Sequence, residues 1–200
     1  DYYCTSETWS VKKSAQHVLM ATNSWLHSQS RQSQHSYDKD KGYVCTFSAM
    51  VIKSTTAHIL HVGDTRIYRL RGNTLEQLTE DHRFWVSQDK SYLSRSLGIN
   101  PQLEIDYQTL QLEQGDIFLF MSDGVYEFAD ANFLVNAIQA HGNDLDKAAK
   151  AIIDEAYKRG STDNLTAQIV RVDELPGQDA NEIYQQLTEL PFPPALDARM

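Results

Sequence analysis

The sequence predicts an α+β protein with antiparallel sheets. An amphipathic helix comes first, a block of short strand-like runs follows, and two helices precede one last strand. Strands that occur in a block, without regular alternation with helices, are typical of antiparallel sheets. A chain of 200 residues suffices for one large domain, or one domain with a tail, and can bury a full hydrophobic core.

The first helix is predicted from apolar positions that repeat at helical spacing and would form one buried face. These positions are Val11, Ala15, Val18, Leu19, Thr22, Trp25 and Leu26. Ser6, Thr8 and Ser10 are candidate N-caps, because a serine or threonine hydroxyl can accept a bond from the first helical turn. The polar stretch 29–41 is expected to form a loop.

Apolar and β-branched runs separated by turn residues predict a series of strands. The expected strands are 43–53, 57–62, 66–71, 74–78, 104–112 and 117–121. We expect the first four to form an antiparallel meander, with a tight turn at Gly72-Asn73. The stretch 82–101 is mixed, and Gly98 would end a short helix there.

Two further helices and a strand complete a predicted domain that spans residues 1–174. The second of these helices would have Asn143 or Asp144 as its cap and Gly160 as its stop. The last strand is expected at 165–172. Residues 175–200 contain four of the five prolines and are predicted to be a linker that leads out of the domain, or a free tail.

Composition argues against several classes of function. The net charge is −9, from 18 basic and 27 acidic residues, so we expect no nucleic-acid partner, because binding phosphates needs clustered Lys and Arg. No apolar run approaches the roughly 20 residues that span a bilayer, so no membrane contact is expected. There are two cysteines, far apart, and Cys45 would be a small core residue. We therefore expect a reducing, cytoplasmic setting.

Two acidic residues stand at the edges of predicted strands. Asp123 follows the run 117–121 within Ser-Asp-Gly, and Asp163 precedes the last strand within Ser-Thr-Asp-Asn. Carboxylate oxygens held on constrained backbone are the ligands that hard divalent cations prefer. Asp-Gly also forms ordinary turns in which the Asp bonds its own backbone, so the spacing alone leaves both interpretations open.

Three further segments extend this pair of motifs. They are His-Val-Gly-Asp-Thr-Arg-Ile-Tyr at 61–68, Leu-Thr-Glu-Asp-His at 78–82 and Ser-Arg-Ser-Leu-Gly at 94–98. Together with the Asp123 and Asp163 motifs, they resemble, in order and composition, the metal-dependent type 2C protein serine/threonine phosphatases over roughly 42–172. Residues 2–12 and 23–27 are similar to the phosphatase portion of bacterial proteins in which a phosphatase is fused to a kinase.

The resemblance implies a fold and a reaction. The expected fold is an antiparallel β-sandwich flanked by helices, in the order α-β-β-α. The expected cofactors are two Mn²⁺ or Mg²⁺ ions at one edge of the sandwich, and a water bridging them would attack the phosphorus of phosphoserine or phosphothreonine in a protein substrate. No catalytic side chain is expected beyond that water.

The resemblance also assigns residues to the metal site. Asp123 and Asp163 would be ligands of the two ions. Asp64 and Glu127 match acids that some family members use for a weaker third ion, although an Asp is frequent at the position of Glu127. Gly124 would lie behind the ligands.

Other residues are assigned supporting roles. Asn164 would shape the turn beside Asp163 or support the ligands from behind. His82 is expected to make structural hydrogen bonds, as are Thr79 and Asp81. Arg95 and Trp85 are candidate substrate contacts in a flap near the site, with packing as the alternative role for the aromatic residues.

The sequence departs from the family in one respect. Family members carry, upstream of these motifs, an Asp, a phosphate-binding Arg and an Asp-Gly pair that bridges both metals, and no segment here matches them; Asp38 and Asp40 stand in the wrong order. We therefore expect a domain that lacks its N-terminal strands, with an exposed sheet edge and with weak or absent activity. A kinase domain is expected beyond residue 200.

Two alternatives stay open. The domain could be a non-catalytic module that regulates a fused kinase and keeps the fold without the metals. It could also be an unrelated domain whose Asp residues only form turns.

Overall fold

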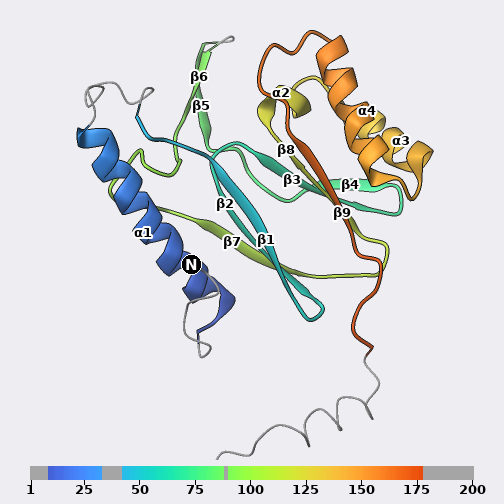
Figure 1. The fold of residues 1–200 in the computed structure, drawn as a ribbon, viewed down its shortest axis with the longest axis horizontal. Helices are drawn as coiled ribbons and strands as arrows, with labels where there is room; N and C mark the ends of the chain where they lie inside the picture. Colours follow the sequence, from blue (N-terminus) through green and yellow to red (C-terminus); the bar gives the residue numbers. More distant parts are fainter. Residues whose placement is uncertain (1–8, 33–41, 88–89, 178–200) are drawn as a thin grey trace, which may run out of the picture.

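The computed structural model describes residues 9–32, 42–87 and 90–177, in which helices lie on both sides of packed strands (Figure 1). One sheet has the strand order β1-β2-β7, a second has the order β4-β3-β8-β9, and β5 pairs with β6 alone. All of these strand pairs are antiparallel. The bounds are α1 Val11–Gln32, β1 Phe47–Lys53, β2 Thr56–Val62, β3 Arg66–Arg71, β4 Thr74–Gln77, β5 Arg83–Ser87, β6 Lys90–Leu93, β7 Asp106–Gln111, β8 Ile117–Met121, α2 Asp123–Tyr126, α3 Ala131–His141, α4 Leu145–Lys158 and β9 Ala167–Arg171.

The first outer layer is α1, which covers one face of the β1-β2-β7 sheet. Ala15 and Leu19 pack with Leu60 of β2, and Ser10 caps the helix by accepting a hydrogen bond from the Lys13 N–H at 3.2 Å. The predicted apolar face is wrong at Trp25, which is 61% exposed. The helix also continues through Gln32, into the stretch that was expected to be a loop.

The last buried position of α1 belongs to a polar residue instead. The Asn23 side chain accepts a hydrogen bond from the Gly98 N–H at 2.8 Å and donates one to the Asn100 carbonyl at 2.9 Å. A buried amide whose donor and acceptor are both satisfied ties the helix to a loop 75 residues away in sequence. Hydropathy alone does not reveal such a contact.

The second outer layer consists of α3 and α4, which cover the β4-β3-β8-β9 sheet. Their side chains share one core cluster with Leu119 and Met121 of β8. Asp130 caps α3, and Asp144 caps α4 by accepting from the Lys147 N–H at 3.1 Å, which selects Asp144 over Asn143. The predicted cap and the two predicted helices are thus confirmed.

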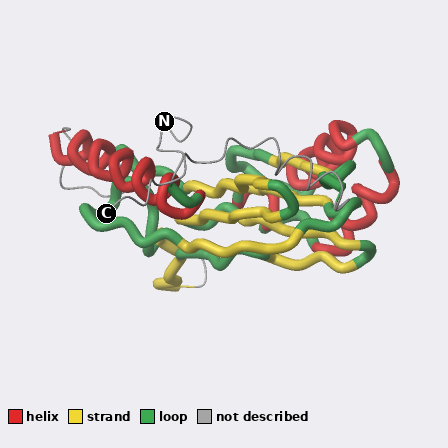
Figure 2. The backbone as a smooth tube through the Cα atoms, turned by 90° about the horizontal axis from the view of Figure 1, so that it is seen from below, coloured by secondary structure: helices red, strands yellow, loops and turns green. Residues whose placement is uncertain are grey.

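The two sheets pack face to face and form an inner core. Ile59 of β2, Ile67 of β3 and Phe118 of β8 belong to one buried cluster. Their neighbours Leu60 and Leu119 point to the opposite faces, toward α1 and toward α3 with α4. The layers are therefore helix, sheet, sheet and helix, and Figure 2 shows the strands stacked between the helices. This is the predicted α-β-β-α sandwich.

Three of the predictions made for residues 43–101 are wrong. The first four strands are not one meander, because the chain crosses from one sheet to the other between β2 and β3, where Gly63 has φ +117°. The stretch 82–101 contains the β5–β6 hairpin in place of a short helix, since Phe84, Trp85 and Val86 favour strand. Cys45 is exposed and is not a core residue.

None of the helices in the described ranges is both long enough and apolar enough to cross a membrane. The exposed sheet edge and the lack of the N-terminal strands were predicted because no segment matches the family's upstream motifs, and these predictions remain untested. The predicted linker at 175–200 lies, beyond residue 177, outside the described residues.

Candidate functional site

The four predicted acidic ligands come from three loops at one end of the sandwich. Asp64 lies in the crossover between β2 and β3, and Asp123 begins the one-turn helix α2 directly after β8. Glu127 is the C-terminal cap of α2, so α2 presents both Asp123 and Glu127. Asp163 lies in the loop between α4 and β9. Segments far apart in the sequence therefore meet at this end.

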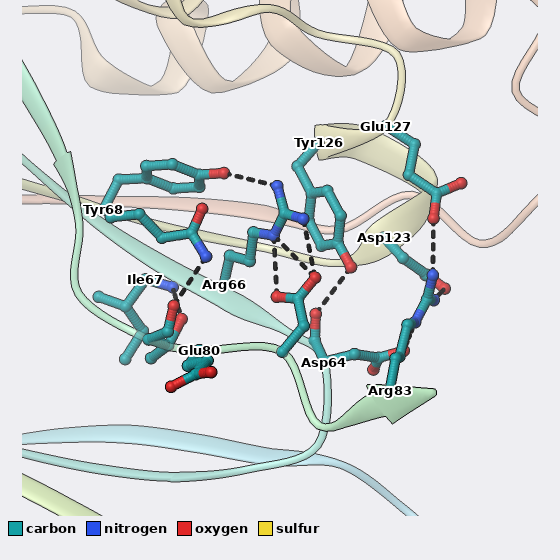
Figure 3. A network of polar contacts seen from close by, with 12 residues as sticks. Asp64, Arg66, Ile67, Tyr68, Glu80, Arg83, Asp123, Tyr126 and Glu127 are labelled. Atoms are coloured by element: carbon teal, nitrogen blue, oxygen red, sulfur yellow. Dashed lines mark hydrogen bonds and ion pairs between the residues drawn. The ribbon is translucent and has the colours of Figure 1, made fainter. Parts of the chain in front are cut away.

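A residue that was not predicted, Arg83, joins three of these acids. Its Nε donates to Asp64 Oδ2 at 2.5 Å, its Nη1 donates to Glu127 Oε1 at 2.7 Å, and its Nη2 donates to Asp123 Oδ2 (Figure 3). Arg83 is the first residue of β5 and reaches the acids from the hairpin. One guanidinium thus binds one oxygen from each of three carboxylates.

The ion pairs around Arg83 are partly removed from water. The side chains of Arg83 and Asp64 are 12% and 11% exposed, whereas that of Glu127 is 45% exposed. Burial opposes the charged form of Arg83, but the hydrogen bonds to Asp64 and Glu127 and the field of Asp64 outweigh it, so the pKa of Arg83 is raised. Arg83 is therefore a permanent cation within the acidic cluster.

A second arginine fixes the backbone around this cluster. The Arg66 guanidinium lies 3.7 Å from the centroid of the Tyr126 ring and forms a bidentate pair with Asp81, with its Nη2 donating to Asp81 Oδ2 at 2.7 Å. The Tyr126 hydroxyl in turn donates to the Asp64 carbonyl at 2.9 Å (Figure 3). Burial raises the pKa of Tyr126. This chain of contacts holds α2 against the crossover that carries Asp64.

Asp163 lies directly behind the start of α2. A Cβ atom added to Gly124 would stand 3.1 Å from the Asp163 Cβ and 2.8 Å from the Asn164 carbonyl oxygen. The Ser161 hydroxyl donates to the Gly124 carbonyl at 2.7 Å, and the Ser122 hydroxyl donates to the Asn164 carbonyl at 3.1 Å. Gly124 and the Asn164 backbone therefore let the two aspartate loops approach each other.

Both aspartates also bond to their own turns. Asp123 Oδ1 accepts from the Gly124 N–H at 2.9 Å, and Asp163 Oδ1 accepts from the Asn164 N–H at 2.7 Å. The turn interpretation of these motifs is thus correct for one oxygen of each carboxylate. It does not account for Asp123 Oδ2, which binds Arg83.

The predicted structural role of His82 agrees with its contacts. His82 Nδ1 accepts from the Gly63 N–H at 3.0 Å, so Nε2 carries the proton and donates to Asp106 Oδ2 at 2.8 Å. Asp106 also accepts from Arg95 Nη1 at 2.8 Å. Burial would raise the pKa of Asp106, but the bonds from His82 and Arg95 lower it. His82 thereby fixes the residue that precedes Asp64.

Thr79 and Asp81 are likewise structural in their contacts. The Thr79 hydroxyl accepts from the Ile67 N–H at 3.0 Å, and Asp81 is the partner of Arg66. Both contacts brace β3 beside the crossover.

The two candidate substrate contacts lie in different surroundings. Trp85 is 62% exposed on the β5–β6 hairpin, so packing is the wrong interpretation for its ring. Phe84 is half exposed and stacks on Tyr92 with 5.8 Å between ring centroids. Residues two apart on a strand share a face, which places Trp85 on the same side of β5 as Arg83.

Arg95 is paired with Asp106 and lines a cavity of about 420 Å³ with Ser94, Ser96 and Glu104.

The acids fit a hard divalent cation in the type of donor that they offer. All four supply carboxylate oxygens, and three of them already converge on a positive charge. Within the described ranges, however, no three acidic, histidine or cysteine side chains lie close enough together to hold a metal ion without further ligands. The donor set is thus suitable in kind and incomplete in number.

Arg83 had no local sequence signal. It lies 19 residues after Asp64 and 40 residues before Asp123, in a stretch whose pattern was mixed. The only available indication was a lone basic residue next to the Asp-His pair at 81–82. Its role becomes visible when β5 is placed beside α2.

Sequence comparisons relate this chain to known proteins. A family model described as "Protein phosphatase 2C" matches residues 4–172. A serine/threonine phosphatase of Listeria welshimeri is 28% identical over 144 residues, which covers 64% of this chain and 57% of that protein. The protein phosphatase PhpP of Streptococcus pneumoniae is 26% identical over 161 residues, which covers 72% of this chain and 65% of that protein. The chain thus spans about three fifths of the length of these relatives.

Solved structures show the same fold. PppA of Pseudomonas aeruginosa superposes with a TM-score of 0.71 at 26% identity, covering 80% of this chain and 69% of that one. The Mycobacterium tuberculosis phosphatase PstP gives a TM-score of 0.74 at 20% identity, covering 86% and 77%. A PstP catalytic domain in complex with two manganese ions gives 0.68 at 21% identity, covering 82% and 74%.

The family match covers most of the chain, the sandwich has the layers of these structures, and the predicted acidic residues gather at one end of it. The chain belongs to the protein phosphatase 2C family.

Proposed function

We propose that this chain is the core of a metal-dependent protein serine/threonine phosphatase that hydrolyses phosphoserine or phosphothreonine. The observation that carries the proposal is the convergence of Asp64, Asp123 and Glu127 on a single cation, with Asp163 packed behind Asp123. Turn hydrogen bonds account for one oxygen of Asp123 and one of Asp163, but they do not explain why three carboxylates converge at one point.

The chain's own residues would do the following. Asp123 and Asp163 would hold Mn²⁺ or Mg²⁺, and Asp64 with Glu127 would hold a further ion more weakly. When bound, such ions lower the pKa of a coordinated water and neutralise charge that develops on a transferring phosphoryl group. Gly124, Ser161 and Tyr126 keep the loops in register. Trp85, which shares a strand face with Arg83, would contact the substrate chain beside the phosphate.

A second function is favoured by a different observation. Arg83 already balances part of the charge of the acids, and no described cluster holds a metal ion unaided. Both facts suit a non-catalytic module that keeps the fold without the metals. A kinase fused beyond residue 200, a linker at 175–200 and a cytoplasmic location remain predictions under either function.

The deciding experiment is Mn²⁺-dependent hydrolysis of a phosphothreonine peptide by the full-length protein. Because metal catalysis contributes several kcal/mol, Asp123→Asn should lower the rate on the order of 100-fold or more. Asp154→Asn is the matched control, since Asp154 is exposed on α4 and pairs with Lys150, away from the acids at the end of the sandwich. An unchanged rate in Asp123→Asn would end the phosphatase proposal.

A companion measurement separates the two functions. The 200 residues alone should turn over the peptide weakly or not at all, because the upstream ligands expected from the family are missing from this sequence. An equal rate for these residues and for the full-length protein would contradict that expectation. No hydrolysis by either one, with the peptide still bound, would favour the non-catalytic module.

A further inference from the structure

The contacts of Arg83 differ from those of two other partly buried arginines, Arg66 and Arg71. Arg66 and Arg71 each direct two nitrogens to one carboxylate, that of Asp81 and that of Asp116. Arg83 directs each of its three nitrogens to a different acid. The bidentate pair is the usual strong arrangement of a guanidinium with a carboxylate. Arg83 forms no such pair, which indicates that the positions of the three acids determine how its guanidinium is oriented.

We propose that Arg83 is a tethered cation that holds Asp64, Asp123 and Glu127 together in the absence of metal and competes with a divalent ion for them. This inference rests on the proposed function, because it concerns the same acids. It adds a residue of the β5–β6 hairpin that sets how tightly the ion binds. The occupant of the cluster would then alternate between Arg83 and the ion.

Charge supports the competition. Three carboxylates carry a formal charge of −3, which one guanidinium reduces to −2. With Arg83 in place the cluster still attracts a cation, but each acid has one oxygen occupied by a hydrogen bond. A divalent ion that approaches these carboxylates is repelled by the guanidinium at close range, and it competes with the guanidinium for the oxygens that Arg83 binds.

The position of Arg83 couples the acids to the hairpin. Arg83 pairs with Leu93 in the β5–β6 ladder and is the first residue of β5. Its three bonds fasten the base of the hairpin to α2 and to the β2–β3 crossover. If an ion displaced the Arg83 guanidinium, the hairpin would lose this attachment. The loss would occur on the face of β5 that also carries Trp85.

The test is calorimetric titration of MnCl₂ into the full-length protein after removal of metal with EDTA. Arg83→Gln removes the competitor, so Mn²⁺ should bind about tenfold more tightly than to the wild type, a change of roughly 1.4 kcal/mol. In EDTA the same variant should unfold at a lower temperature than the wild type, because the three carboxylates then repel one another without a counter-ion. Tighter binding together with lower metal-free stability is the expected signature.

The matched control is Arg159→Gln. Arg159 also binds two acids, Glu155 and Asp130, but on the exposed surface at the end of α4. This variant has the same change of charge and should leave the Mn²⁺ affinity unchanged. An equal gain in both variants would show a general charge effect and would overturn the proposal.

Further outcomes are informative in either direction. If Arg83→Gln does not fold, Arg83→Lys keeps the charge but replaces the wide planar guanidinium with a compact ammonium that does not reproduce its three-way geometry, and it should still bind Mn²⁺ more tightly than the wild type. Wild-type or weaker affinity in a folded Arg83 variant would overturn the inference. If Asp123→Asn weakens binding while Arg83→Gln does not tighten it, only this inference fails. If no variant binds Mn²⁺, this inference and the proposed metal site fail together.

Discussion

At the scale of single residues, Asp116 shows how a turn residue becomes a structural ion pair. Its carboxylate is completely buried and accepts from Arg71 Nε and Nη2, each at 2.7 Å, and from the Glu113 N–H at 2.9 Å. Burial alone would raise the pKa of Asp116, but the hydrogen bonds from Arg71 and Glu113 lower it below its ordinary value of 3.8. The pair ties the end of β3 to the turn before β8.

Asp116→Asn should destabilise the protein by about 2 kcal/mol at pH 7, because Arg71 loses its charged partner in a partly buried setting. The folded carboxylate has a lowered pKa, so its contribution to stability is fully present above about pH 4 and is lost as the pH falls through the folded value. Urea unfolding at pH 7 and at pH 3 should therefore give a smaller difference between variant and wild type at pH 3. A difference that does not depend on pH would assign the effect to shape and not to charge.

At the scale of elements, the β5–β6 hairpin is the part of the site that sequence patterns described least well. It carries both Arg83 and the exposed Trp85, and Phe84, Trp85 and Val86 are all half exposed or more. Exposed aromatic side chains on a hairpin next to a polar site are typical of contacts with a partner chain. Under the proposed phosphatase function, the hairpin is therefore the element that would select the peptide around a phosphorylated residue.

Trp85→Ala should raise the KM for a phosphothreonine peptide about fivefold, because truncating one exposed aromatic contact costs roughly 1 kcal/mol of binding. The rate with a small aryl phosphate should stay the same, since that substrate has no chain to contact the ring. Trp25→Ala is the matched control, because Trp25 is equally exposed but lies on α1. Equal losses with the peptide and with the aryl phosphate would contradict a role in peptide binding.

Elements that depend on interactions between residues close in the sequence could be predicted, whereas those that depend on contacts between distant segments could not. The strand Arg66–Arg71 and the strand Ile117–Met121 depend on local patterns, and they were predicted correctly. The cap of α4 was predicted as Asn143 or Asp144, and it is Asp144. The crossover between β2 and β3 and the placement of Arg83 depend on contacts between distant segments. No periodicity or turn dipeptide carries that information.

The site illustrates the same limit. Asp123 and Asp163 could be named because Ser-Asp-Gly and Asp-Asn stand next to apolar strands, whereas Asp64 and Glu127 were assigned only through the family resemblance. The structure brings Asp64, Asp123 and Glu127 onto one cation. The contact of the Tyr126 hydroxyl with the Asp64 carbonyl spans 62 residues, and it could not be foreseen. Thr79 and His82 could be classed as structural, but their partners Ile67 and Gly63 could not be named.

At the scale of the whole molecule, the site depends on two separate cores. Consecutive residues of β8 face opposite ways: Phe118 points into the core between the sheets, and Leu119 points into the core under α3 and α4. Both side chains are fully buried. Because β8 leads directly into Asp123, packing on both of its faces fixes where the site begins.

Phe118→Ala should therefore cost about 3–5 kcal/mol of unfolding free energy, and Leu119→Ala about 2–5 kcal/mol, because each leaves a cavity in a different core. A two-layer protein would lose this much at only one of the two positions, since the other face of the strand would meet water. Urea unfolding of both variants, followed by circular dichroism, measures the two costs. The control is Ile52→Ala on β1, because the Ile52 side chain is exposed and its truncation should cost less than about 0.5 kcal/mol. Ala129→Gly would not serve, since Ala129 is itself buried. A loss of unfolding free energy below about 1 kcal/mol at either Phe118 or Leu119 would contradict the helix–sheet–sheet–helix arrangement. Only in a strand that is covered on both faces do two neighbouring side chains each contribute strongly to stability.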